Sequence, residues 1–268
     1  MFYVKALVLA IIEGLTEFLP ISSTGHLILA DSLLRLSENK QFVDAFVVLI
    51  QLPAILAVVV YFRNDLWPFG AGAEVRTQRF RLWLKVCAAF VPAAVAGYLF
   101  DDVIERKLLF EVPVAIALIL GGIAFILIER GDLPIRFETV EAIAFRHAIA
   151  IGLFQCLALV PGVSRSGASI FGAMMLGAAR PAAARFSFYL AIPTMGAAWA
   201  YTVLKTGLSF SAPEWIALVS GSAVSFAVAY AVVAFLMGFV QRHRFTVFGY
   251  YRIVLGAIVL IQIGRAHV

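Results

Sequence analysis

Long apolar runs separated by short polar segments make up most of this chain. Six of the runs approach the roughly 20 residues that an α-helix needs to cross a bilayer. They are residues 42–62, 82–100, 112–129, 186–204, 215–240 and 246–264. The pattern predicts six transmembrane helices, and therefore an all-α polytopic membrane protein whose single membrane domain covers residues 1–268.

Two further apolar regions, residues 2–36 and 147–179, are interrupted near their centres, at residues 20–25 and 161–167. The arm after each interruption has about 12 residues, and at ~1.5 Å per residue it covers little more than half of the ~30 Å hydrocarbon core. Irregular backbone at that depth is tolerated only where it lines a polar cavity. We therefore predict two re-entrant helical hairpins in addition to the six spans.

The two interrupted regions are similar to each other in sequence. One constant shift aligns polar and glycine positions of the first with those of the second: Glu13 with Gln155, Ser22 with Ser164, Thr24 with Ser166 and Gly25 with Gly167. A hairpin plus three spans in each half gives an odd number of membrane crossings. The two halves, residues 1–134 and 135–268, are therefore predicted to be repeats of inverted topology.

Composition and charge support a membrane protein and exclude other classes. Hydrophobic residues make up 63% of the chain and charged residues 14%, which is outside the range of soluble globular proteins. The net charge of +5 comes from Lys and Arg scattered over short loops, so no nucleic-acid partner is expected. More of them lie opposite the N-terminus, among them Arg63, Arg76, Arg130, Arg146 and Arg242. The positive-inside rule makes that side cytoplasmic and places both termini outside.

The first interrupted region carries a pair of carboxylates in its apolar helix. Glu13 and Glu17 are four residues apart, which places them on one helical face. Two like charges so close repel each other unless a cation or a proton lies between them. The pair therefore predicts a divalent cation site, with Mg²⁺ or Ca²⁺ as the ion, or a shared proton. A solvated polar stripe is the alternative, although ionisable groups at membrane depth are seldom without function.

Hydroxyls and an imidazole follow the carboxylates at residues 22–26. Ser22, Ser23 and Thr24 precede a short helix, where N-capping explains Ser22 and Thr24 as well as phosphate binding does. His26 is close in sequence to Ser23 and to a carboxylate, so it is expected to act as a catalytic acid or base, and a hydrogen-bonded core histidine is the alternative.

The second interruption supplies a cation. Arg165 has a planar guanidinium suited to phosphate oxygens, and the turn glycines with the following helix N-terminus offer backbone N–H donors. Together these groups predict an anion site. Neutralisation of Glu13 or Glu17 is the alternative role for Arg165, and the two roles can coexist.

Residues 13–27 (EGLTEFLPISSTGHL) and 161–167 (PGVSRSG) resemble the two signatures of the undecaprenyl-diphosphate phosphatase family, also called bacitracin-resistance proteins. The likeness covers essentially the whole chain. It implies hydrolysis of undecaprenyl diphosphate to the monophosphate carrier used in peptidoglycan synthesis, bacitracin resistance, and a location in the bacterial plasma membrane. The implied partners are the polyprenyl diphosphate substrate and membrane lipids, and a homodimer is left open.

The resemblance also assigns roles to residues. It implicates Glu13, Glu17, Ser23, His26, Ser164 and Arg165, with Ser169 where the family usually has threonine. We expect Glu17, Ser23, His26 and Arg165 to be catalytic, with Ser23 as nucleophile and a directly activated water as the competing route. The expected phosphate ligands are Arg165, Ser164, Ser166, Ser169, Thr24 and Ser22, and the expected metal ligands are Glu13 and Glu17. The site is expected to face the periplasm.

A lipid-phosphate flippase is the alternative function, because discontinuous helices that point at an anion are also typical of secondary transporters. The dense set of acids, bases and hydroxyls beside Arg165 favours an enzyme, since transport alone does not require it.

Overall fold

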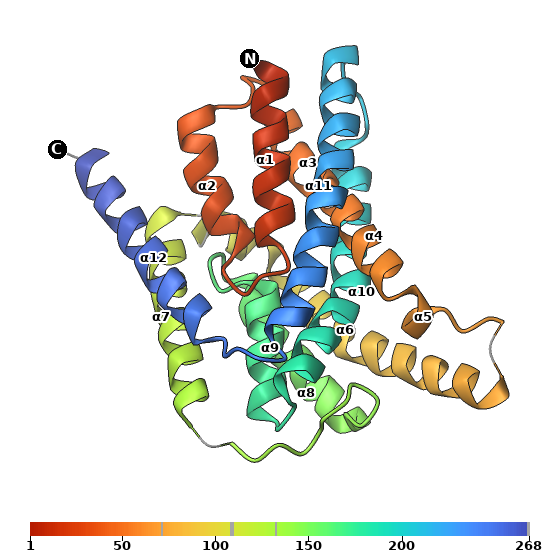
Figure 1. The fold of residues 1–268 in the computed structure, drawn as a ribbon. Helices are drawn as coiled ribbons and strands as arrows, with labels where there is room; N and C mark the ends of the chain where they lie inside the picture. The colour runs from red at the N-terminus through yellow and green to blue at the C-terminus, as the bar shows by residue number, and fades with distance from the viewer. Residues whose placement is uncertain (71, 108–109, 132, 267–268) are drawn as a thin grey trace.

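The computed structural model describes residues 1–70, 72–107, 110–131 and 133–266, and within them the chain is helical with no β-sheet (Figure 1). In chain order the elements are α1 (Phe2–Thr16), α2 (Ser23–Leu34), α3 (Lys40–Leu49), α4 (Gln51–Tyr61), α5 (Arg63–Leu66), α6 (Ala73–Lys107), α7 (Glu111–Arg130), α8 (Phe145–Gln155), the 3₁₀ turn η1 (Cys156–Leu159), α9 (Arg165–Met175), α10 (Arg180–Thr206), α11 (Ala212–Phe239) and α12 (Thr246–Ala266).

Two helical hairpins meet near the centre of the molecule. In Figure 1, α1 runs down from the N-terminus and α2 returns, whereas α8 and α9 form a second hairpin in the lower half. The connecting loops touch, because the Ser166 hydroxyl donates a hydrogen bond of 2.9 Å to the carbonyl of Leu19. The helix breaks therefore lie where the sequence interruptions predict them.

Within the described residues, four helices are long and apolar enough to cross a membrane, as judged by length and composition. They are Lys40–Tyr61, Ala73–Phe100, Glu111–Arg130 and Ala212–Phe239, and they coincide with four of the six predicted spans. The other two predicted spans lie in α10 and α12. The 27 residues of α10 include Pro193 and Thr194, which make it less apolar, and the apolar part of α12 is short. A polytopic all-α membrane protein is confirmed, and the count of six spans stays a prediction.

The predicted span 42–62 is two helices rather than one, because α3 ends at Leu49 and α4 begins at Gln51. Pro53 explains the break, since it has no N–H to donate to the carbonyl four residues earlier. The neighbouring carbonyl of Ile50 accepts a hydrogen bond of 3.0 Å from the buried hydroxyl of Ser225 on α11. At the break, Gln51 lines the central cavity, and the preceding carbonyl of Ile50 has a hydrogen-bond donor in Ser225.

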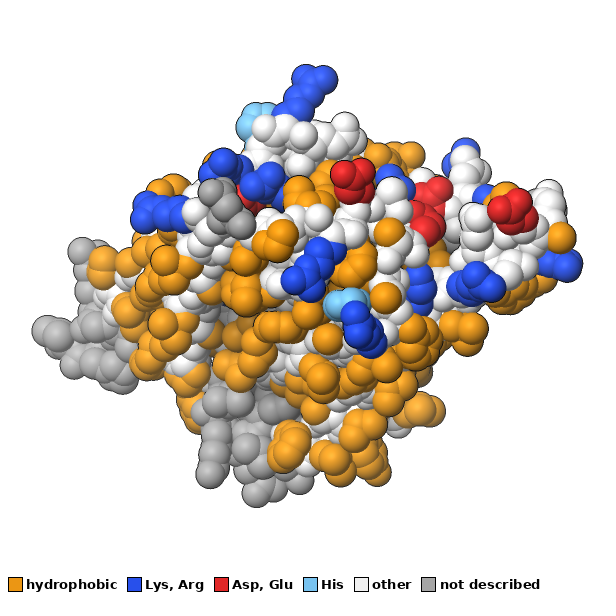
Figure 2. All heavy atoms as spheres, turned by 90° about the horizontal axis from the view of Figure 1, so that it is seen from below, with side chains coloured by type: hydrophobic (Ala, Val, Ile, Leu, Met, Phe, Trp, Pro, Cys, Tyr) orange, Lys and Arg blue, Asp and Glu red, His pale blue; other side chains and the backbone are white. Residues whose placement is uncertain are grey.

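Basic side chains gather on the lower face of the molecule. Figure 2 shows this face from below, with Lys and Arg side chains above broad hydrophobic flanks. The arginines predicted to share the cytoplasmic side include six that are exposed: Arg63, Arg76, Arg130, Arg136, Arg146 and Arg242. The N-terminus and the end of α12 lie on the opposite side (Figure 1).

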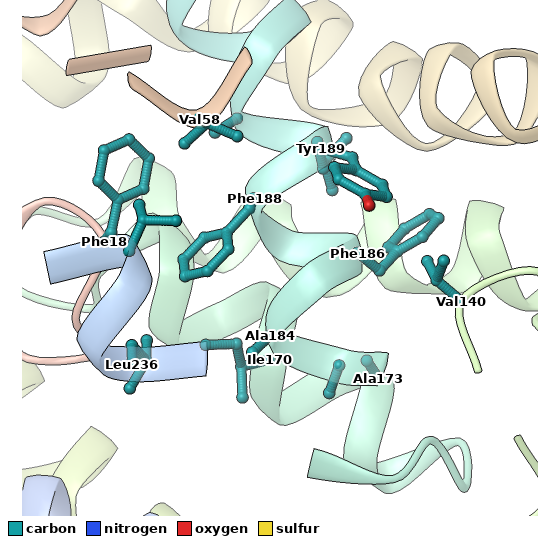
Figure 3. Packing of buried hydrophobic residues seen from close by; sticks show 14 of the residues in the cluster. Phe18, Val58, Val140, Ile170, Ala173, Ala184, Phe186, Phe188, Tyr189 and Leu236 are labelled. Carbon is teal, nitrogen blue, oxygen red and sulfur yellow. The ribbon is translucent and has the colours of Figure 1, made fainter. Parts of the chain in front are cut away.

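The largest hydrophobic core surrounds α10 (Figure 3). Phe186, Phe188 and Tyr189 are buried there, and Phe18 from the first hairpin loop meets Phe188 edge to face at 5.5 Å between ring centroids. Phe18 follows Glu17 directly in the chain. Burial of this ring therefore anchors the loop that carries the candidate catalytic carboxylate.

Close packing between α6 and α8 depends on Gly152. A Cβ atom at this position would lie 2.0 Å from the carbonyl oxygen of Ala89. We expect Gly152→Ala to lower the midpoint of thermal unfolding in detergent, since overpacking of a well-packed contact costs about 1–3 kcal/mol. In the matched control Gly196→Ala, the new Cβ meets nothing within 4 Å, so stability should be unchanged or slightly higher. Equal unfolding midpoints for the two variants would contradict this account of the interface.

Candidate active site

A cavity of about 500 Å³ lies where the two hairpin loops meet. Its polar lining comes from both loops and from helices beside them: Glu17, Ser22, Ser23, Thr24, Gln51, Gln155, Ser164, Arg165 and Thr194. Its apolar lining comes mainly from α6 and α10. A smaller cavity of about 210 Å³ near the Glu129–Arg180 ion pair contains none of the predicted site residues.

Glu17 connects the two hairpins at this cavity. One oxygen, Oε2, accepts a hydrogen bond of 2.7 Å from the Ser23 hydroxyl. The other, Oε1, forms an ion pair with Nη2 of Arg165 at 3.3 Å, and both side chains are nearly buried. Glu17 continues the α1 helix as its C-cap residue, so its position is fixed by the helix. The structure thus brings together three of the four residues expected to be catalytic.

The Arg165 guanidinium is held from three directions. Nη1 donates to the carbonyl of Ser187 at 2.9 Å, Nη2 faces Glu17, and the Phe18 ring lies beneath the guanidinium carbon at 5.9 Å. Buried Nε has no hydrogen-bond partner among the described residues. The guanidinium therefore keeps N–H donors for a further acceptor in the cavity it lines.

Ser22 and Ser164 hold equivalent positions in the two loops. Both have positive φ, 72° and 75°, which is rare for residues other than glycine. Their hydroxyls accept hydrogen bonds from the backbone N–H groups of Gly25 (3.4 Å) and Gly167 (3.0 Å). Both serines therefore cap a helix, and the first turns of α2 and α9 face the cavity. Strained backbone of this kind is concentrated at functional sites.

Ser166 and Ser169, which the sequence assigns to phosphate binding, are fully buried and do not line the cavity. The Ser166 hydroxyl contacts Leu19 and Ser164, while the Ser169 hydroxyl donates to Ser187 Oγ at 2.7 Å. These contacts hold the segments that carry Arg165. The structure thus gives both hydroxyls a positioning role, whereas Thr24 does line the cavity.

His26 points away from the cavity lining. Nδ1 lies 2.7 Å from the carbonyl of Ser22, and Nε2 lies 2.6 Å from the hydroxyl of Tyr251, on whose ring the imidazole is stacked. No hydrogen bond to Ser23 or Glu17 is formed among the described residues. The role of His26 as a proton shuttle stays a prediction.

Glu13 is fully buried one turn before Glu17, and its two carboxyl oxygens form no well-aligned hydrogen bond among the described residues, although the Glu17 and Gln51 side chains lie nearby. It lies close enough to Glu17 and Arg165 to interact with both electrostatically. The described residues include no group of three or more His, Cys, Asp or Glu side chains placed to hold a metal. Two carboxylates suffice for Mg²⁺ when substrate phosphates complete its shell, so these residues fit a divalent cation.

Comparison with known proteins identifies the family. The family description "Bacitracin resistance protein BacA" matches residues 6–258. The chain belongs to this family. The resemblance based on the two hairpin motifs is thereby confirmed.

Relatives of this BacA family member are similar over nearly their whole length. "Undecaprenyl-diphosphatase 1" of Clostridioides difficile is 47% identical over 258 residues, covering 96% of this chain and 94% of the relative. "Undecaprenyl-diphosphatase" of Enterococcus faecalis is 47% identical, with 96% and 95% of the two chains covered. The protein of that name from Fusobacterium nucleatum is 48% identical, with 95% and 98% covered.

The sequence analysis missed Arg252, although an arginine inside the apolar run 246–264 was a visible signal. Its side chain is completely buried and donates only to backbone carbonyls: Pro20 in the first loop, Gly162 and Val163 in the second, and Ala117 and Leu118 in α7, at 2.8–3.3 Å. These carbonyls lie in irregular backbone and in a helix packed beside it. Arg252 therefore fastens both hairpin loops to the α7–α12 pair.

Gln155, which is buried, was noted only as part of the repeat, and its partly buried partner Thr194 was not predicted as a site residue. Gln155 Nε2 donates to Thr194 Oγ1 at 3.2 Å, and both residues line the cavity. Their positions in apolar runs explain why composition alone did not single them out.

We expect Arg252→Met to lower both the thermal stability and the activity of this BacA family member. The variant leaves several buried carbonyls without a donor, at about 1–3 kcal/mol each. Arg252→Lys should recover little, because one ammonium cannot reach carbonyls on three segments. Unfolding midpoints and phosphate release in detergent measure the two effects, with the exposed Arg242→Met as control. A methionine variant as stable as the control would refute the fastening role.

Proposed function

We propose that this protein hydrolyses undecaprenyl diphosphate to undecaprenyl phosphate and inorganic phosphate, and so recycles the lipid carrier of peptidoglycan synthesis. The relatives named undecaprenyl-diphosphatase, at 47–48% identity over nearly full length, support this activity. The match to the family described as bacitracin resistance proteins supports a role in bacitracin resistance as well. The observation that carries the assignment to this cavity is the contact of Glu17 with both Ser23 and Arg165.

The geometry supports Ser23 as the nucleophile. The Arg165 guanidinium and the first turns of α2 and α9 bind the diphosphate, since helix N-termini and guanidinium groups both favour phosphate. Glu17 accepts the proton of the Ser23 hydroxyl as Oγ forms its bond to the terminal phosphorus. The bridging P–O bond breaks and releases undecaprenyl phosphate. Water then hydrolyses the phosphoserine, and the protonated Glu17 returns its proton to Oγ of Ser23 as the phosphate leaves. Direct attack by water remains the competing route.

Glu13 and Glu17 would hold a divalent cation, Mg²⁺ or Ca²⁺, which supplies positive charge to neutralise the phosphate oxygens. The burial of Glu13 one turn before Glu17, with no well-aligned hydrogen bond to its oxygens among the described residues, supports this assignment. Arg165 also neutralises Glu17, so the carboxylates do not depend on the cation alone.

The membrane arrangement is part of the proposal. Six spans and two re-entrant hairpins form two inverted halves, residues 1–134 and 135–268. The matching positive φ and caps of Ser22 and Ser164 support the repeat. The basic lower face supports a cytoplasmic location for that side (Figure 2). In this orientation the protein lies in the bacterial plasma membrane and its site opens toward the periplasm.

Glu17→Gln tests the assigned activity. The amide keeps the volume of the side chain but cannot accept the Ser23 proton, so phosphate release from undecaprenyl diphosphate should fall by at least about 100-fold, a typical general-base contribution. Glu138→Gln changes an exposed glutamate and should keep wild-type rates. A Glu17→Gln protein with wild-type turnover would overturn the assignment.

Glu13→Gln tests the metal proposal. We expect wild-type activity to be lost on chelation and restored by Mg²⁺ or Ca²⁺, and the variant to need a higher cation concentration for half-maximal activity. Calcium or magnesium binding can be measured directly by titration calorimetry of the wild-type and variant proteins. Identical binding curves would remove Glu13 from the cation site.

Sidedness is tested by cysteine labelling. With Cys87 and Cys156 replaced by Ser, Thr24→Cys should react with a membrane-impermeant thiol reagent in spheroplasts, because Thr24 lines the cavity. Labelling of Thr24→Cys that requires access from the cytoplasmic side would show that the site opens toward the cytoplasm, opposite to the proposed orientation. Labelling from both sides would favour the flippase.

A further inference from the structure

The cavity has two chemically distinct ends. Glu17, Ser23 and Arg165 form the charged end at the hairpin loops. The rest of the lining is mostly apolar and comes from two neighbouring helices, with Phe90, Ala93 and Ala94 on α6 and Met195 and Ala198 on α10. An amphiphile with a charged head and an apolar chain matches this division.

The apolar lining follows one face of each helix. On α6 it continues from Phe90 through Gly97 to Tyr98, and on α10 from Thr194 to Tyr201, a strip of about 10 Å at ~1.5 Å per residue. Several residues along the strips are alanine or glycine. A Cβ at Gly97 would make only ordinary contact, 3.5 Å from Leu159. Small side chains on facing helices leave the space that forms the groove.

The outer end of both strips reaches the surface. Tyr98 is 80% exposed and Tyr201 is 46% exposed, whereas Glu17 at the other end is 8% exposed. Tyrosine is typical of positions where an apolar path meets a polar boundary. A cavity of about 500 Å³ cannot enclose an undecaprenyl chain together with its diphosphate, so most of the chain must leave it.

We propose that the groove between α6 and α10 holds the first isoprene units of the substrate, and that the small residues Gly97 and Ala198 determine how the prenyl chain passes into the bilayer. This inference rests on the proposed function, since the diphosphate at the charged end fixes where the chain begins. The groove is continuous with the site that takes the head group, which is why a prenyl chain is its occupant.

Ala198→Phe and Gly97→Leu test the groove by narrowing it. We expect the KM for undecaprenyl diphosphate to rise at least about tenfold, equivalent to losing the contacts of roughly two buried methylene groups. The kcat and the inhibition constant of inorganic diphosphate, which has no prenyl chain and needs only the charged end, should change less than about twofold. Ala200→Phe, on another face of α10 and outside the cavity lining, is the matched control. An unchanged KM for undecaprenyl diphosphate would overturn the proposal. An equal loss of affinity for the substrate and for the diphosphate inhibitor would overturn it as well.

Thiol protection tests the groove without turnover. With Cys87 and Cys156 replaced by Ser, undecaprenyl phosphate should slow maleimide labelling of Ala198→Cys but not of Ala200→Cys. Absence of protection, or equal protection by phosphatidylglycerol, would refute a prenyl-specific groove. If undecaprenyl phosphate protected Ala198→Cys in a protein that releases no phosphate, the prenyl groove would be supported and the proposed phosphatase activity would be refuted.

Discussion

Two carboxylates and a guanidinium in an apolar interior are stable only as a mutually compensating set. Glu17 is the centre of that set, because it accepts from Ser23 in its own hairpin and from Arg165 in the other. Removing one partner of a buried pair typically costs 3–5 kcal/mol, since the remaining charge is uncompensated. The same contact aligns a hydroxyl, a base and a phosphate-binding cation. The contacts among Glu17, Ser23 and Arg165 therefore both neutralise the buried charges and align the groups proposed to react.

Interrupting two hairpins at the centre of the molecule exposes backbone groups that a continuous helix would satisfy. The structure satisfies them from side chains: Ser22 and Ser164 cap the returning helices, Ser166 donates to Leu19, and Arg252 donates to both loops. Ser225 does the same at the α3–α4 break. Irregular backbone beside the cavity is thus retained through a small number of dedicated donors.

Sequence patterns predicted the hairpin breaks because Pro, Gly and Ser interrupt apolar runs there, and the aligned motifs correctly placed Ser23 and Arg165 at one cavity. They failed where three-dimensional direction matters. Spacing could not show that Ser166 and Ser169 point into packing contacts, or that His26 stacks on Tyr251. A single arginine, Arg252, within a long apolar run carried no indication of its partners, and Pro53 was too weak a signal to divide a span. Several of these features depend on partners more than 100 residues away in the chain: Leu19 for Ser166, Tyr251 for His26 and Pro20 for Arg252.

Arg252 also has a consequence for biosynthesis. It lies on α12, which is synthesised after both loops, yet its hydrogen bonds reach the carbonyls of Pro20 and Val163 in those loops. Until α12 inserts, both loops lack the donor that joins them. The order of synthesis therefore delays the assembly of a competent site until α12 has inserted, and a chain terminated before α12 would be inert rather than a partly active hydrolase.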